Sequence, residues 1–227
     1  MTDKFKGTLA DIVDTQIETL LTRVTSTDEE PDDLDILIKK VDFPVFIKQL
    51  SRVGYSQYSH DQALGGRVNG MQVNLVKADR IKIDLHQDFT WRKKYYCDLS
   101  LIWKKSVISE IRKISMKEPA PNINAFIIAI NTIFEKTYLE KGDWKYLEKN
   151  LKVLPIFSSQ ARKYGWYRTW FGFVKWWKNV KAGDQFPVFL PFKLIFLSYL
   201  EKFNFVSLLY YLFFRTRFFL NKTLPYS

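Results

Sequence analysis

The order of apolar and polar residues predicts alternating strands and helices in the first half of the chain. Residues 34–38 form a short, apolar, β-branched run, which predicts a buried strand. The next segment starts at Asp42 and stops at Gly54, and its apolar residues recur at helical spacing, which predicts a helix. Residues 67–77 and 81–89 alternate on either side of a polar turn, so we expect a β-hairpin there.

The two ends of this first half also have patterns that predict secondary structure. Thr8 and Asp11 have the spacing of a capping box, which predicts a helix starting at Thr8. The apolar face of this helix would comprise Leu9, Ile12, Val13, Ile17, Leu20 and Leu21. Residues 107–116 have the pattern of another short strand pair. Together these elements predict an α/β (α+β) fold built on a small mixed sheet with flanking helices.

After Pro119 the apolar period becomes helical. One helix is expected to end at Gly142, a second to begin at Asp143, and two apolar helical runs to occupy residues 193–203 and 206–219. We therefore divide the chain into a sheet domain, residues 1–118, and a helical, basic and aromatic C-terminal region, residues 119–227. Charged residues interrupt the last runs, so we expect no transmembrane segment.

Composition narrows the class of protein. Of the 227 residues 47% are apolar, enough for a sizeable core, and the single cysteine, Cys97, excludes an internal disulfide. The polar N-terminus shows no secretory signal, so a cytoplasmic location is expected. The chain has no G-x-x-x-x-G-K-[ST], no H-E-x-x-H, no Cys/His zinc spacing and no Ser-centred elbow. These absences argue against the common NTPases, zinc enzymes and serine hydrolases.

The formal charge of +11 is concentrated in the last third of the chain. After residue 150 a dozen lysines and arginines face only Asp184 and Glu201. Such clustering favours an anionic partner, either a nucleic acid or a membrane surface contacted peripherally. We expect three lysines to lie exposed beside the active cleft, namely Lys175, Lys178 and Lys181. Four tryptophans at helical spacing could stack on nucleobases or form a core: Trp166, Trp170, Trp176 and Trp177.

Three carboxylates are the strongest candidates for chemistry. Asp33 and Asp35 are two residues apart on a predicted strand, so both lie on one face. Asp84 interrupts the apolar strand Ile-Asp-Leu, where a carboxylate is costly unless a cation holds it. Brought together, the three would form an oxygen-only site suited to Mg²⁺. In the competing interpretation, Asp33 belongs to a solvated turn and Asp84 faces solvent.

Two residues near Asp84 complete this prediction. His86 shares the strand face of Asp84 and could act as a base or a phosphate donor, or be a histidine satisfied by a neighbouring carbonyl. Lys82 is expected to point away from the Asp84 face into solvent.

The same residues carry a resemblance to a known family. Asp-Asp-Leu-Asp-Ile-Leu-Ile at residues 32–38, the Asp-Phe-Pro helix start, the Gly-Tyr turn and Ile-Asp-Leu-His at residues 83–86 follow one another in order. In order and spacing they resemble the uncharacterised nucleotidyltransferase-like families of the polymerase-β superfamily. The segment from residue 119 to 144 resembles the helical stretch that follows the sheet in archaeal members. The resemblance covers roughly residues 10–150.

This resemblance implies a metal-dependent nucleotidyltransferase that moves an NMP from an NTP to an unknown hydroxyl acceptor. Asp33, Asp35 and Asp84 would be the catalytic and metal-binding residues, with Mg²⁺ or Mn²⁺ as the cofactor. Members of the family carry Gly-Ser about twelve residues before the first aspartate, where this chain has Leu-Thr-Arg at residues 21–23.

In that segment Thr22 could replace the serine hydroxyl, and Arg23 could contact the nucleotide. His86, on the later predicted strand, could contact the nucleotide as well. Asn131 stands where a histidine is expected. The alternatives are a catalytically degenerate module of the same fold that binds nucleic acid or a protein partner, and a peripheral membrane protein.

Overall fold

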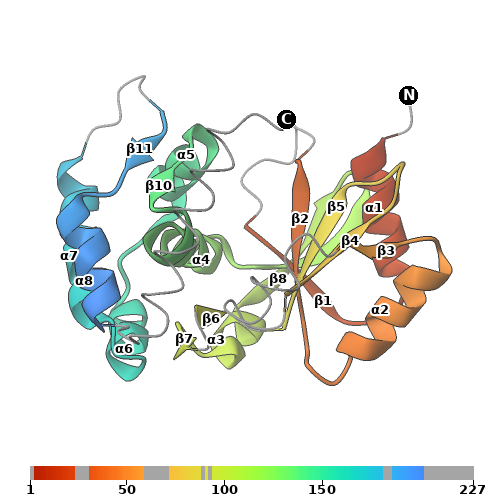
Figure 1. Ribbon diagram of the computed structural model, residues 1–227, viewed down its shortest axis with the longest axis horizontal. Coiled ribbons are helices and arrows are strands. Elements are labelled where there is room, and N and C mark those ends of the chain that lie inside the picture. Colours follow the sequence, from red (N-terminus) through yellow and green to blue (C-terminus); the bar gives the residue numbers. More distant parts are fainter. Residues whose placement is uncertain are drawn as a thin grey trace, which may run out of the picture.

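A five-stranded mixed sheet forms the first half of the protein. The computed structural model describes residues 3–23, 31–58, 72–87, 90–91, 94–180 and 186–201. The strand order is β1-β2-β5-β4-β3, with β2 and β5 parallel and the other neighbours antiparallel (Figure 1). The strands are β1 (Thr19–Thr22), β2 (Asp33–Ile38), β3 (Ser56–Tyr58), β4 (Gln72–Val76) and β5 (Lys82–His86). The predicted hairpin is thus confirmed as the β4–β5 pair.

Two helices cover one face of this sheet. Helix α1 (Lys4–Val13) and helix α2 (Phe43–Arg52) bury their apolar faces against alternate residues of β2, namely Leu34, Ile36 and Ile38. Gly54 follows α2 at φ +97°, a left-handed conformation that favours glycine, which confirms the predicted helix stop. The opposite face of β2 carries Asp33, Asp35 and Leu37, and neither α1 nor α2 covers it.

The N-terminal helix differs from its prediction. It begins four residues earlier, because the side chain of Asp3 accepts a hydrogen bond from Lys6 N at 2.9 Å and caps it. Thr8 lies inside the helix, and its hydroxyl accepts a bond from Ile81 N at 2.9 Å. The helix ends at Val13, while Leu20 and Leu21 belong to β1, which is buried on both faces. Because β1 is buried throughout, its residues do not alternate between apolar and polar, and their pattern also fits the apolar face of a helix.

Shorter elements connect the sheet to the helical region. They are β6 (Thr90–Trp91), β7 (Lys94–Tyr95), α3 (Leu99–Lys104), β8 (Ser106–Ile111) and β9 (Ile114–Pro119). The last two pair as an antiparallel hairpin, which confirms the strand pair predicted at residues 107–116.

Helices dominate the remainder of the described chain. Helix α4 (Pro121–Asn131) continues into a π-helical turn, η1 (Thr132–Lys136), which stops at Thr137 in a left-handed conformation. The remaining elements are β10 (Tyr138–Leu139), α5 (Lys141–Asn150), α6 (Pro155–Lys163), α7 (Tyr167–Asn179), β11 (Val188–Phe189) and α8 (Phe192–Glu201). Gly142 and Asp143 lie within the first turn of α5, so the predicted stop and cap at these residues are wrong.

This half of the fold confirms the predicted helical C-terminal region, although the boundary at residue 118 stays a prediction. The predicted helix at 193–203 corresponds to α8, and the run 206–219 lies outside the described residues. Trp166 and Trp170 are fully buried among Phe126, Phe157 and Phe173, so they form a core and are not available to stack on bases. Among the described residues, none of the helices is both long and apolar enough to cross a bilayer.

Candidate functional site

Two of the predicted carboxylates lie side by side at the centre of the sheet. In the parallel register of β2 and β5, Asp35 pairs with Asp84 and Asp33 pairs with Lys82. Residues at matched positions of adjacent strands point to the same face, so all four side chains leave the sheet together. This is the face opposite α1 and α2. The side chains of Asp35 and Asp84 are 13% and 12% exposed, whereas Asp33 lies at the more open edge.

Lys82 joins two of these carboxylates. Its Nζ lies 3.1 Å from Asp84 Oδ1 and 3.2 Å from Asp33 Oδ2. The prediction that Lys82 points away from Asp84 is wrong, because residues two apart on a strand share a face. Burial on its own lowers the pKa of Lys82, but the charges of Asp84 and Asp33 outweigh it and raise that pKa. Lys82 therefore stays protonated and neutralises part of the acidic cluster.

Asp84 is the carboxylate best placed to accept a proton. Burial raises its pKa above the usual value, and the nearby charge of Asp33 acts in the same direction. Lys82 and His86 oppose this shift but do not cancel it. A carboxylate held in this way binds a proton more strongly than one in water, as a general base requires.

A second group of donors surrounds Asp35. Arg23 forms an ion pair with Asp35 Oδ1, and His86 Nε2 lies 3.0 Å from the same oxygen. The guanidinium Nη2 of Arg23 is 3.4 Å from His86 Nε2, so the three side chains form one network. The prediction that His86 shares the face of the carboxylates agrees with these contacts. Arg23 and His86 are also the nitrogen groups best placed to meet an anionic ligand at this site.

The backbone holds Arg23 in an uncommon conformation. Its φ is +59°, in the left-handed region, and its N–H donates to Asn124 Oδ1 of α4 at 2.8 Å. Neighbouring Thr22 is buried, and its hydroxyl donates to the carbonyl of Asp35 at 3.2 Å. In this structure Thr22 therefore ties β1 to β2, while Arg23 extends over the acidic face. The contact with Asn124 also joins this edge of the sheet to the helical region.

The helical region contributes charged groups that the sequence did not reveal. Lys136 Nζ of η1 lies 3.4 Å from Asp143 Oδ2 and 3.6 Å from Glu140 Oε2. Burial raises the pKa of Asp143, whereas the charges of Lys136 and Arg23 act to lower it. The influence of Arg23 places Asp143 within electrostatic reach of the site on the sheet. No sequence motif marks this electrostatic influence, because Asp143 and Arg23 are 120 positions apart.

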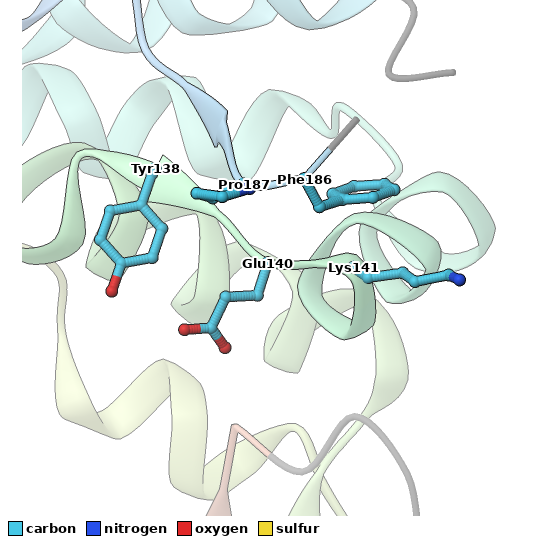
Figure 2. Close-up of a pocket in the computed structure, with 5 residues that line it drawn as sticks. All are labelled: Tyr138, Glu140, Lys141, Phe186 and Pro187. Atoms are coloured by element: carbon cyan, nitrogen blue, oxygen red, sulfur yellow. The ribbon is translucent and has the colours of Figure 1, made fainter. Parts of the chain in front are cut away.

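A pocket opens beside Glu140. Its volume is about 410 Å³, and it is lined by Tyr138, Glu140, Lys141, Phe186 and Pro187. Figure 2 shows Tyr138 and Glu140 pointing to the same side, whereas Lys141 points away from them. The lining thus combines an aromatic wall with a carboxylate. Lys136 forms ion pairs with Glu140, which lines the pocket, and with Asp143, whose pKa the charge of Arg23 acts to lower. These ion pairs relate the pocket to the site on the sheet.

The chemistry of the donors fits a hard divalent cation, because three carboxylates share one sheet face. In the arrangement seen here these oxygens contact protein cations. Among the described residues, no three acidic, histidine or cysteine side chains converge closely enough to hold a metal together. A metal bound by both Asp33 and Asp84 would have to displace Lys82 from between them.

Comparison with known proteins gives only distant likenesses. No protein-family model and no curated protein sequence matches the chain. The lincosamide antibiotic adenylyltransferase LnuA, with lincomycin bound, is 13% identical and covers 67% of this chain and 98% of its own, with a TM-score of 0.45. The antibiotic-resistance factor ANT(2'')-Ia, in complex with adenylyl-2''-tobramycin, is 8% identical and covers 72% and 94%, with a TM-score of 0.46. At these scores the likeness carries no functional argument.

Proposed function

We propose that this protein is a nucleotidyltransferase that moves an NMP from an NTP to a hydroxyl acceptor. One observation carries the proposal: Asp35 and Asp84 lie side by side on adjacent parallel strands, both largely buried, on the sheet face that also carries Asp33. Lys82, Arg23 and His86 contact these carboxylates, so the face combines buried acids with cations that an anionic nucleotide and a metal ion could engage in their place. The order of the motifs that contain these aspartates resembles the nucleotidyltransferase-like families and agrees with the proposal.

Asp84 acts as the general base in this proposal. The acceptor hydroxyl gives its proton to the Asp84 carboxylate as its oxygen attacks the α-phosphorus of the NTP. A new P–O bond forms to the acceptor, and the bond to the β-phosphate oxygen breaks, so that pyrophosphate leaves. Burial supports this role, because it raises the pKa of Asp84 and strengthens its hold on the proton.

Arg23 and His86 are the proposed nucleotide-binding groups. Both now contact the same oxygen of Asp35, and both can donate hydrogen bonds to phosphate oxygens. The bond from Arg23 N to Asn124 fixes the base of the arginine, so its guanidinium can move between Asp35 and a phosphate while the backbone stays in place. Thr22 would require a rearrangement before its hydroxyl could contact a ligand, since it is buried in the sheet.

Asp33, Asp35 and Asp84 would hold Mg²⁺ or Mn²⁺ only after their carboxylates move closer together, because in this structure they do not converge on one point. When bound, such an ion supplies positive charge that neutralises the phosphates and the leaving pyrophosphate. Lys82 would then have to leave its position between Asp33 and Asp84, and its long side chain, one third exposed, has room to do so.

A second function is favoured by the same cations. Lys82 and Arg23 already neutralise the acidic face, as expected for a degenerate module that keeps the fold and binds a nucleic acid or a protein partner without catalysis. Metal binding distinguishes the two proposals, because only the enzyme needs a cation at this face.

The experiment is a thermal melt of the full chain with each NTP, with and without Mn²⁺. We expect a rise in Tm that requires both the nucleotide and the metal, since a ligand that binds the folded state alone stabilises it. Asp35→Asn should remove this rise, whereas Asp79→Asn, a matched change of an exposed carboxylate in a turn, should preserve it. A wild-type chain with no shift for any NTP would favour the degenerate module.

A further inference from the structure

An exposed apolar stripe runs along α8, at the C-terminal end of the described chain. Phe192, Phe196 and Leu200 are spaced by four residues, so they share one face of the helix. Phe192 is 81% exposed, and the other two are each more than half exposed. The rings of Phe192 and Phe196 stack on each other with their centroids 6.4 Å apart. Large apolar side chains arranged in this way mark a contact surface.

The opposite face of α8 holds the helix in place. Leu194 and Ser198 are buried, and Leu194 packs so closely on α7 that a Cβ at Gly172 would lie 3.0 Å from its Cδ1. The outward direction of Phe192 and Phe196 is therefore fixed by packing on the other side of the helix. Phe171 of α7, next to Gly172 in the sequence, is also more than half exposed.

Helix α7 adds positive charge beside this stripe. The exposed positions of α7 follow helical spacing and include Lys175 and Lys178. Glu201, at the end of α8, accepts hydrogen bonds from the backbone N–H groups of Arg168 and Thr169, at the start of α7. The two helices are therefore antiparallel, which brings the lysines of α7 to the end where α8 starts.

The part of the sequence that forms this surface contains few acidic residues. Between residues 152 and 201 the sequence contains only Asp184 and Glu201, and the carboxylate of Glu201 is used by the two N–H groups of α7. Lys193 is exposed next to Phe192, so cations flank the aromatic stripe directly. Exposed phenylalanines bordered by lysines, with little opposing charge, are typical of helices that lie in the interface of an anionic bilayer.

The position of this surface contradicts the prediction that the lysines of α7 lie beside the active cleft. Figure 1 places α7, α8 and β11 at the end of the molecule away from β2 and β5, with α4 and α5 between them. Lys175 and Lys178 are exposed as predicted, but they do not border the acidic face, and Lys181 lies outside the described residues. The basic surface of α7 therefore lies away from the acidic face of the sheet.

We propose that the outward faces of α7 and α8 bind an anionic membrane surface. The phenylalanines and Leu200 enter the headgroup region, and the lysines bind acidic headgroups. This contact holds the protein on the bilayer without spanning it and leaves the acidic face of the sheet open. The proposal does not depend on nucleotidyl transfer, since it uses none of the residues of that site.

The test is co-sedimentation of the full chain with vesicles of phosphatidylcholine alone or mixed with phosphatidylserine. Wild type should bind the mixed vesicles much more tightly than the neutral ones, and added salt should weaken the binding. Phe192→Ser with Phe196→Ser should lower the binding about tenfold or more. The matched control is Val41→Ser with Ile108→Ser, which removes two apolar side chains, 80% and 78% exposed, outside the helical region and should change nothing.

Charge is tested by a second pair of variants. Lys175→Glu with Lys178→Glu should lower binding to the mixed vesicles, whereas Lys40→Glu with Lys48→Glu, two exposed lysines elsewhere, should lower it much less. A thermal melt of each variant checks that it is folded.

Three results would overturn the proposal. The first is wild type that does not bind mixed vesicles. The second is a serine double variant with unchanged binding. The third is a serine double variant with a clearly lower Tm or an altered oligomeric state, which would show that protein covers this face. Binding to an oligonucleotide in place of vesicles would assign the basic surface to nucleic acid.

Discussion

Replacing Lys82 by methionine removes the cation between two carboxylates and keeps most of the side-chain volume. Lys82 Nζ lies 3.1 Å from Asp84 and 3.2 Å from Asp33, and Asp84 is largely buried. In the variant, Asp33 and Asp84 share one sheet face without that charge. Burial and like-charge repulsion both favour the protonated form of Asp84, so its pKa rises further above the usual value.

The loss in the free energy of unfolding can be bounded from how exposed the Lys82–Asp84 ion pair is. Breaking a fully buried ion pair costs about 3–5 kcal/mol, whereas an exposed pair contributes about 1 kcal/mol or less. Lys82 is one third exposed and Asp84 is 12% exposed, so an intermediate value applies. We expect the free energy of unfolding to fall by about 2 kcal/mol at neutral pH, which lowers Tm by roughly 4–8 °C for a chain of this size.

The loss has a definite pH dependence. An acid whose folded pKa is raised lowers stability once the pH is above that pKa, and this penalty disappears as the pH falls and the carboxyl becomes protonated. The difference in Tm between Lys82→Met and wild type should therefore be largest near neutral pH and shrink toward about pH 4. Excess Mn²⁺ should restore more Tm in the variant than in wild type, because a divalent cation can replace the lost charge.

The assay is a series of thermal melts against pH, with Lys163→Met as the control. Lys163 pairs with Asp98 at 3.3 Å on the surface, and its loss should cost little at any pH. An equal loss of Tm at neutral and acidic pH would refute the reasoning, because it would show that Lys82 stabilises by packing. No loss at all would show that Lys82 does not neutralise the buried carboxylate.

Four further predictions follow from the site and its surroundings. Asp35→Asn should lower nucleotidyl transfer about a thousandfold with little loss of Tm, measured as product formed per enzyme. Transfer should lose activity at acidic pH as Asp84 becomes protonated and can no longer accept the proton of the acceptor hydroxyl, which a rate profile against pH measures. Asn124→Ala should cost about 1–2 kcal/mol in thermal melts and weaken NTP binding, because it removes the acceptor for the backbone N–H of Arg23. Burial raises the pKa of Cys97 to about 12, so iodoacetamide should label it only on unfolding, as mass spectrometry can show.

Controls separate these effects from general damage. Asp79→Asn is the control for Asp35, since both remove one carboxylate and Asp79 lies in an exposed turn. Asn179→Ala removes an exposed amide that bonds within α7, so it should leave NTP binding unchanged. Rapid labelling of Cys97 in the folded protein would contradict its complete burial. An Asp35→Asn variant with wild-type transfer would remove the acidic face from the reaction.

The sequence contained enough information to place the acidic face but not the cations that bind it. D-x-D spacing and a carboxylate in an apolar strand predicted Asp35 and Asp84, and the parallel register brings them together. Lys82 could have been placed by the same two-residue spacing, which puts it on the face of Asp84. The position of Arg23 could not be predicted in this way, because its left-handed backbone is held by a hydrogen bond to Asn124, 101 residues further along the chain.

The helices and strands show the same limit. Helix α2 was predictable because apolar spacing, the Pro start and the Gly stop agree. Strand β1 was not, since Leu20 and Leu21 are buried on opposite faces in different cores and leave no alternating pattern. The contact of Lys136 with Asp143 spans only seven residues, but it depends on the π-helical turn and the left-handed Thr137 between them, which no sequence pattern predicted.

Label transfer from α-labelled NTPs tests the central claim most directly. The protein is incubated with each NTP, Mg²⁺ or Mn²⁺ and a mixed pool of hydroxyl acceptors, in parallel with γ-labelled NTPs and with Asp35→Asn. The account predicts that label from the α-phosphate appears on an acceptor with wild type, does not appear with the variant, and never comes from the γ-phosphate. Absence of α-label transfer for every NTP, or equal transfer by Asp35→Asn, would contradict it.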